Sequence, residues 1–282
     1  MDGGKEQHGA KTGAHSLTSA PMNTAAIPNS AAVSRLRIVL VGTQHPGNIG
    51  AAARALKTMG LARLVLVAPE QYPSDEAFRR AAGADDLLAQ AVVVPDLAQA
   101  VADCHAVLGC TARSRRVQLP EYEPREAAAR AVALAGEGEV ALVFGRERTG
   151  LTNEELQLCH AAVHIPANPD YSSLNLAAAV QVLSYELRLA LRDGAAPTVA
   201  VATPHADELP ADHAQLEGFY GQLGQTLDDI DFHKGRSPDS ALRKLRRVFN
   251  RSQLSLQEVR LLRGILADAQ RMARLAREKG DQ

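Results

Sequence analysis

The sequence predicts an α/β fold built on a mostly parallel sheet with helices on both faces. Two observations lead to this prediction. Short runs of apolar, partly β-branched residues recur through residues 35–192 and alternate with segments of helical spacing. Each run is apolar almost throughout, rather than at every second position, which is typical of strands buried on both faces of a parallel sheet. Ordinary connection rules then predict an open, doubly wound arrangement.

The expected elements follow one another in a regular order. Strands are predicted at 37–41, 64–67, 91–94, 106–110, 140–144 and 162–165. Helices are expected at 49–59, after the capping residues Ser74 and Asp96, and at 124–134. Gly60 should end the first helix in the left-handed conformation. Thr152 and Glu155 form a T-x-x-E capping box for another helix, and a longer helix is expected to begin near Ser173.

The two ends of the chain differ from this central part. Residues 1–34 are rich in small and polar residues, so we expect a disordered tail. Residues 193–210 hold three prolines and no helical pattern, which indicates a linker before a helical extension at 211–282. Its helices are expected at 213–226, 240–250 and 257–274, the last with an apolar face of Val259, Leu262, Ile265, Leu266 and Ala269.

Composition limits the class of protein. The 282 residues are 46% hydrophobic, enough for one domain of ordinary size and a small second unit, and the net charge of −1 neither requires nor excludes nucleic acid. No apolar run reaches the ~18 residues that span a bilayer. The N-terminus lacks the apolar segment of a secretory signal, and the three cysteines lack C-x-x-C spacing. We therefore expect a cytoplasmic protein without a membrane partner or a required metal.

Three ordered motifs resemble a known family. They are GTQHPGNIGAAARALKTMG at 42–60, FGRERTGL at 144–151 and IPANPDYSSLNLAAAV at 165–180. Each lies where a predicted strand ends, the place where open α/β sheets hold ligands. Together they resemble motifs 1, 2 and 3 of the SPOUT class of RNA 2′-O-ribose methyltransferases. This resemblance, over residues 36–192, implies a deep trefoil knot, S-adenosylmethionine as methyl donor, and a homodimer whose sites are completed across the subunit interface.

The resemblance also implies the residues of the site. Arg54 matches the catalytic arginine, Asn48, Glu147 and Asn175 match supporting positions, and Ser173 matches the serine near the cofactor and the reactive ribose. Contacts to the methyl donor are implied for Cys110, Thr111, Ala112, Gly145, Ile165, Ser172, Ser173 and Leu174. Small residues let a backbone approach a ligand closely, which suits Gly109, Ala112 and Gly145.

Two basic stretches are candidates for RNA binding. Arg113, Arg115 and Arg116 form a basic loop beside the expected donor site. Between residues 233 and 251 there are seven Lys or Arg against one acid, and the RNA candidates in this stretch are Arg243, Lys244, Arg246 and Arg247. Phosphate contacts need such a patch, although a solvated helix face has the same composition.

Within the family, the motifs and the KLRRVF segment at 244–249 are most similar to bacterial enzymes that methylate cytidine or uridine at tRNA position 32, the first nucleotide of the anticodon loop. We therefore expect this reaction. The alternatives are a related methyltransferase acting on another tRNA position or on rRNA, and a catalytically silent RNA-binding protein with the same fold. A plain nucleotide-binding α/β enzyme is disfavoured because the sequence has neither a P-loop nor a complete G-x-G-x-x-G.

Overall fold

The computed structural model of the chain describes residues 30–112, 119–193, 209–234 and 237–280. Its centre is a seven-stranded sheet of order β3-β2-β1-β6-β4-β7-β5, in which every paired strand is parallel. The strands are β1 (Leu36–Val41), β2 (Arg63–Val67), β3 (Val92–Val94), β4 (Cys104–Cys110), β5 (Glu121–Tyr122), β6 (Glu139–Phe144) and β7 (Ala161–Val163). The expected parallel α/β fold is confirmed.

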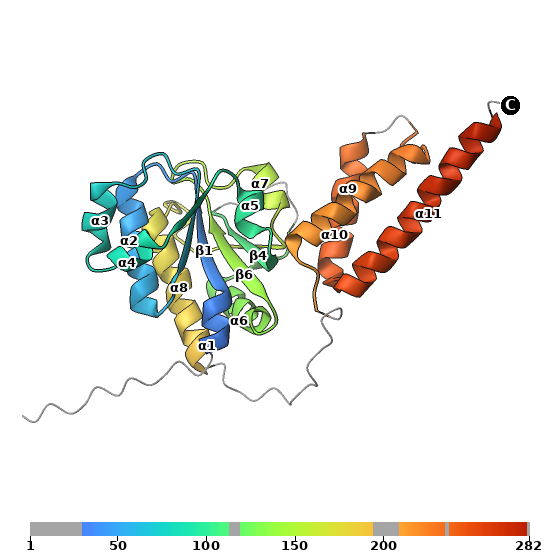
Figure 1. Cartoon of the computed structure of the whole chain (residues 1–282). Helices are drawn as coiled ribbons and strands as arrows, with labels where there is room; N and C mark the ends of the chain where they lie inside the picture. The colour runs from blue at the N-terminus through green and yellow to red at the C-terminus, as the bar shows by residue number, and fades with distance from the viewer. Residues whose placement is uncertain (1–29, 113–118, 194–208, 235–236, 281–282) are drawn as a thin grey trace, which may run out of the picture.

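Helices cover both faces of this sheet (Figure 1). They are α1 (Ser30–Arg35), α2 (Pro46–Met59), α3 (Asp75–Ala81), α4 (Asp85–Ala89), α5 (Leu97–Val101), α6 (Pro124–Ala135), α7 (Asn153–Gln157) and α8 (Leu176–Asp193). In β1, Ile38 and Leu40 join a core shared with α2, α6 and α8, whereas Val39 and Val41 join a second core with α5 and α7. Both sets are buried, which explains why the strands are apolar throughout.

Local signals placed several helix ends correctly. Gly60 ends α2 at φ 76°, in the left-handed region. The Thr152–Glu155 capping box is present at the start of α7, and the predicted caps of α3 and α5 accept main-chain hydrogen bonds from their own helices. The starts of two helices were wrong by three residues: α2 was predicted from 49 but begins at Pro46, and α8 was predicted near Ser173 but begins at Leu176. Asn175 Oδ1 accepts from the main-chain N–H groups of Ala177 and Ala178, so the helix begins after Asn175.

The boundary of the N-terminal tail was also placed too late. Residues 30–34 lie within α1, while residues 1–29 lie outside the described residues. Ala32 is fully buried against the core, and Arg35 Nη1 donates to the carbonyl of Gly136 at 2.7 Å. Composition alone missed this helix because its single turn is stabilised by packing on a distant segment. Helix α4 and strand β5 were not predicted, because α4 has no side-chain N-cap to mark its start and β5 has only two residues.

The C-terminal unit is a helical extension, as expected. Helices α9 (His213–Asp229), α10 (Pro238–Ser252) and α11 (Leu256–Gly280) enclose their own core around Phe219, Tyr220 and Val259. Figure 1 shows this unit beside the β4 side of the sheet, where Ala214 N–H donates to Ala102 O at 2.9 Å. The predicted apolar face of α11 is wrong at Ile265, which is 58% exposed.

Three further expectations concern the whole chain. Most of the predicted linker, residues 194–208, lies outside the described residues. The knot remains a prediction from the family resemblance. No helix among the described residues is long and apolar enough to cross a membrane.

Candidate functional site

A cavity lies at the carboxyl ends of β4, β6 and β7, where the loops that follow these strands converge. Its volume is about 460 Å³, within the usual range for small-molecule sites. All eight residues that the sequence implied for the methyl donor line it: Cys110, Thr111, Ala112, Gly145, Ile165, Ser172, Ser173 and Leu174. Leu176 and Ala179 at the start of α8 add apolar wall. We call this the strand-end cavity.

Glu147 organises the loop between β1 and α2. The main-chain N–H of Gln44 donates to both of its carboxylate oxygens at 3.2 and 3.0 Å, and that of His45 donates to Oε1 at 3.1 Å. Asn48 Nδ2 donates to the same oxygen at 3.0 Å. Partial burial opposes ionisation, but the hydrogen bonds from Asn48, Gln44 and His45 hold the pKa of Glu147 below its usual range. The ionised carboxylate thus holds the motif 1 loop in place through these hydrogen bonds.

The same network reaches the motif 3 loop. Asn175 Nδ2 donates to Asn48 Oδ1 at 3.0 Å, while its own Oδ1 caps α8. Glu147, Asn48 and Asn175 are therefore joined in one chain of hydrogen bonds, although they come from three separate motifs. Their side chains hold the three loops together, which makes them positioning residues in this structure.

Arg146 anchors the loop after β6 to α7. Its guanidinium pairs with Glu155 at 3.0 Å, and the loop closes on itself through hydrogen bonds between Arg146 and Gly150. A Cβ on Gly145 would lie 2.1 Å from the backbone of Gly150. Gly145 is therefore required for this tight turn. Gly109 was expected to make room for a ligand, but a Cβ there would meet the sulfur of Cys159 at 2.8 Å, so it makes room for core packing.

Cys110 lines the strand-end cavity as a neutral thiol. Burial raises the pKa of Cys110 to about 12, because no charged group compensates for desolvation of the thiolate. A thiolate is the reactive nucleophile of cysteine, and it would compete for an electrophilic methyl group. Keeping the thiol protonated makes the wall of the cavity inert toward such a ligand.

A second, more open cavity adjoins the first. It has a volume of about 440 Å³ and is lined by Gln44, His45, Glu147, Arg148 and Ser173. Glu147, Arg148 and Ser173 line both cavities, so a molecule in this adjoining cavity would meet a ligand held in the strand-end cavity. The pair of cavities suits a transfer reaction between a bound small molecule and a larger substrate that enters from solvent.

Comparison with known proteins identifies the family. The sequence profile of the SpoU rRNA methylase family matches residues 35–185, the part of the chain that builds the sheet and both cavities. This chain belongs to the SpoU rRNA methylase family. The profile of the C-terminal domain of the tRNA methyltransferase TrmJ matches residues 214–278, so the helical extension has relatives of its own.

Individual relatives of the SpoU family agree over nearly their full length. The chain is 49% identical over 249 residues to the tRNA (cytidine/uridine/adenosine-2′-O-)-methyltransferase TrmJ of Pseudomonas aeruginosa strain UCBPP-PA14, covering 86% of this chain and 96% of that protein. Its structure is similar to that of TrmJ from Z. mobilis ZM4, with 36% identity, a TM-score of 0.70, and coverage of 82% of this chain and 97% of the other. A probable methylase family protein from Haemophilus influenzae Rd KW20 is 41% identical with a TM-score of 0.57, over 86% and 99% of the two chains. Enzymes of the SpoU family use S-adenosylmethionine as methyl donor.

Arg54, the expected catalytic arginine of this SpoU site, lies elsewhere on α2. It is exposed, lines neither cavity, and has no hydrogen bond or ion pair within the described part of the chain. It follows Asn48 by six residues, which places it about 9 Å farther along the helix axis and on a different face. A single chain therefore does not bring Arg54 to its own strand-end cavity, and its catalytic role stays a prediction.

The RNA candidates divide into three groups. Arg113, Arg115 and Arg116 lie outside the described residues. Arg243, Lys244 and Arg247 are exposed on α10. Arg246 is turned inward: it pairs with Glu217 on α9, and its guanidinium lies 4.4 Å from the centre of the Tyr220 ring. Arg246 therefore stabilises the C-terminal unit through its contacts with α9.

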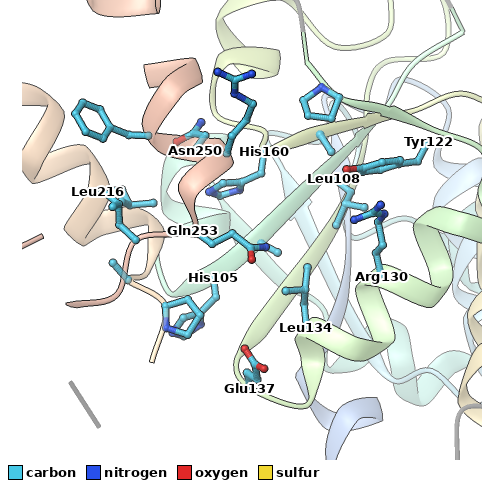
Figure 2. A pocket seen from close by; sticks show the side chains of 18 residues that line it. His105, Leu108, Tyr122, Arg130, Leu134, Glu137, His160, Leu216, Asn250 and Gln253 are labelled. Atoms are coloured by element: carbon cyan, nitrogen blue, oxygen red, sulfur yellow. The ribbon is translucent and has the colours of Figure 1, made fainter. Parts of the chain in front are cut away.

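A third cavity lies far from these motifs, between the sheet edge and the C-terminal unit. Figure 2 shows Tyr122, Arg130 and Leu134 on one side and Asn250 and Gln253 on the other. Its volume is about 460 Å³, and none of the sequence-implied donor or catalytic residues lines it. His160 on its wall accepts from the main-chain N–H of Val107 through Nδ1, and burial lowers the pKa of His160 to about 4. That imidazole is neutral and structural.

Sequence reasoning missed three residues of the SpoU site. Gln44, His45 and Arg148 line the adjoining cavity but were not singled out. The available signal was their place within motifs 1 and 2, directly beside Asn48 and Glu147. What the sequence did not show was that Glu147, about a hundred residues away, folds back onto the main chain of Gln44 and His45.

Proposed function

We propose that this protein transfers the methyl group of S-adenosylmethionine to the ribose 2′-hydroxyl of cytidine or uridine at position 32 of tRNA. One observation carries this proposal. Hydrogen bonds between Glu147, Asn48 and Asn175 join motifs 1, 2 and 3, and the cavity beside them is lined by all eight residues implied for the donor. The names of its relatives support the reaction and the substrate class. The position within the tRNA rests on the resemblance of motifs and C-terminal segment.

The residues present suit the methyl donor. Apolar side chains of Ile165, Leu174 and Leu176 would enclose the adenine, and the hydroxyls of Ser172 and Ser173 would bind its polar groups. S-adenosylmethionine supplies a positively charged sulfonium that makes its methyl group electrophilic. The target ribose would enter through the adjoining cavity, with Arg148 available for a neighbouring phosphate.

The experiment is methyl transfer by the full chain to unmodified tRNA transcripts carrying C, U, A or G at position 32. Ribose methylation is then mapped by mass spectrometry of nuclease fragments. We expect modification of C32 and U32. The P. aeruginosa relative is named for adenosine as well, so A32 is a second candidate substrate. Methylation at another tRNA position or only in rRNA would contradict the proposal, and donor binding without any methylated RNA would favour the silent RNA-binding alternative.

We infer that the C-terminal unit binds the tRNA. Between residues 237 and 280 there are eleven Lys or Arg against four Asp or Glu, and the segment matches the C-terminal domain of TrmJ. Removal of residues 211–282 should abolish tRNA modification but leave donor binding measurable by calorimetry. Unchanged tRNA affinity of the shortened protein would contradict this assignment.

We also propose a homodimer in which Arg54 completes the site of the partner subunit. Support comes from the position of Arg54, exposed and away from the cavities of its own chain, and from Tyr171 and Tyr185, which are 82% and 49% exposed near α8. In such a dimer, mixing Arg54→Ala and Ser173→Ala subunits creates one intact site in each mixed dimer. Activity should then recover to a substantial fraction of the wild-type value. A monomer with full activity at nanomolar protein, or no recovery after mixing, would refute the shared site.

A further inference from the structure

The reaction needs a group that accepts the proton of the 2′-hydroxyl. Ribose O2′ forms the new bond to the methyl carbon, the carbon–sulfur bond breaks toward sulfur, and the hydroxyl proton must leave. The positive charge of the sulfonium thereby passes to whatever takes this proton. That acceptor has to face the adjoining cavity, because this cavity meets the strand-end cavity at Glu147, Arg148 and Ser173.

The described residues that line the adjoining cavity can be compared one by one. Arg148 stays protonated in proteins and has no lone pair to offer. The hydroxyl of Ser173 and the amide of Gln44 are not bases near neutral pH. Glu147 is ionised, but its oxygens already accept from three donors and its pKa is held low, so it attracts a proton weakly. His45 is the remaining side chain, and imidazole is the side chain that most readily takes a proton at physiological pH.

His45 has no evident structural task in this position. It is the N-cap residue of α2, yet its side chain makes no capping hydrogen bond. Ser, Thr, Asp and Asn are the residues that usually stabilise a helix at this position. The side chain is exposed, and its main-chain N–H is fixed by Glu147 at 3.1 Å. The backbone is therefore held in place while the imidazole remains available to a substrate.

We propose that His45 is the general base of the reaction and accepts the 2′-hydroxyl proton of the target ribose. This inference rests on the proposed methyl transfer. The imidazole becomes imidazolium as the carbon–oxygen bond forms, and it returns the proton to water after the methylated RNA leaves. Arg54 would then act through its charge rather than as a base.

The charged groups around His45 come from three elements. Glu147 and Arg148 belong to the loop after β6, and Glu70 follows β2 and accepts from Gln44 Nε2 at 3.0 Å. Glu76 on α3 lies against Gly47, since a Cβ on Gly47 would be 2.8 Å from its Oε1. Arg80, also on α3, lies against Gly47 as well, since a Cβ there would be 3.5 Å from its Cγ.

Remaining histidines of the described chain are placed elsewhere. His164 lies near the end of β7 with Nδ1 at 3.3 Å from the carbonyl of Thr111, and it does not line the adjoining cavity. His105 and His160 line the sheet-edge cavity of Figure 2. His105 therefore offers a matched control for a substitution of the same type.

The test is the pH dependence of single-turnover methylation by the full chain, with saturating donor and tRNA. For the wild type we expect a rate that rises tenfold per pH unit and then levels off once the general base is deprotonated. His45→Asn puts a residue that favours the N-cap position there, but its amide cannot accept the proton. It should lower the rate at pH 7.5 by ~10²- to 10⁴-fold and remove the plateau, so that its rate keeps rising to pH 9.

Two further measurements separate catalysis from structure. Donor affinity of His45→Asn by calorimetry should match the wild type, its melting temperature should be no lower, and added imidazole should restore part of its rate. His105→Gln should keep the wild-type plateau. If His45→Asn retains the plateau with the same midpoint, or if imidazole restores nothing, His45 is not the base. A wild type that methylates no tRNA would instead refute the proposed function, before any variant is compared.

Discussion

Glu147 offers the sharpest test of how the site is assembled. In Glu147→Gln one acceptor oxygen remains for the N–H groups of Gln44, His45 and Asn48, and an amide N–H₂ is brought against donors. A hydrogen bond to a charged group contributes about 1.5–3 kcal/mol. Because Glu147 is only half-buried, we take the lower end and expect a loss of about 2 kcal/mol, which corresponds to a melting temperature lower by about 4–8 °C in a domain of this size.

The pH dependence of this loss has a definite sign. The pKa of Glu147 is lowered in the folded chain, so its contribution to stability is fully present above the ordinary glutamate pKa and is lost as pH falls through the folded value. The difference in melting temperature between wild type and Glu147→Gln should be largest at pH 7 and shrink as pH falls from about 5 toward 3. Differential scanning calorimetry over this range measures it.

Glu147→Gln should also lower the rate of methyl transfer, by a larger factor than its loss of folding stability alone would cause. The loop that carries Gln44, His45 and Asn48 loses its anchor, and a displacement of about 1 Å in a reacting group can cost ~10²-fold in rate. Donor affinity should change only a few-fold, because the strand-end cavity is walled mainly by other loops. Glu137→Gln, an exposed glutamate at the opposite end of β6, serves as the matched control. A melting-temperature difference that is the same at pH 7 and pH 4, or wild-type activity in Glu147→Gln, would refute the role of Glu147 in holding the motif 1 loop.

Three other outcomes are expected. Arg54→Ala should lose activity by on the order of a hundredfold or more, with nearly unchanged donor affinity. Arg54→Lys should recover only a small part of this activity, because lysine keeps the charge but lacks the planar guanidinium. A fully active Arg54→Lys would contradict this expectation. Replacing the exposed pair Arg243 and Lys244 with Glu should weaken tRNA binding and lower the salt dependence of the affinity by roughly one counterion per lost phosphate contact. An unchanged dependence of the affinity on salt concentration, measured by filter binding, would argue against α10 as an RNA surface. Gly145→Ala should lower donor affinity at least tenfold by calorimetry, since its Cβ would meet the backbone of Gly150 at 2.1 Å; wild-type affinity would show that the turn can adjust.

The sequence could predict which residues lie near the candidate site, but it could not predict how they are arranged. The eight residues that the motif resemblance implied for the donor all line one cavity, and their binding of the donor stays a prediction. The resemblance could not show that Arg54 lies outside that cavity or that Arg246 is paired with Glu217. Nor did it point to His45, which lines the adjoining cavity. These facts depend on how loops from different strands meet, and sequence spacing carries no information about that.

By itself, the sequence determined the local structure of this protein. Continuous apolar runs specified strands buried on both faces, and Gly60, Thr152 and Glu155 marked helix ends, because such signals depend on residues within one or two turns. The tertiary structure alone decided the rest. Helix α8 begins at Leu176 because Asn175 both caps it and bonds Asn48, and residues 30–35 are helical because the core accepts Ala32. The site exists only when the parallel sheet brings three distant loops to one edge, since the hydrogen bonds that hold it join residues about a hundred positions apart.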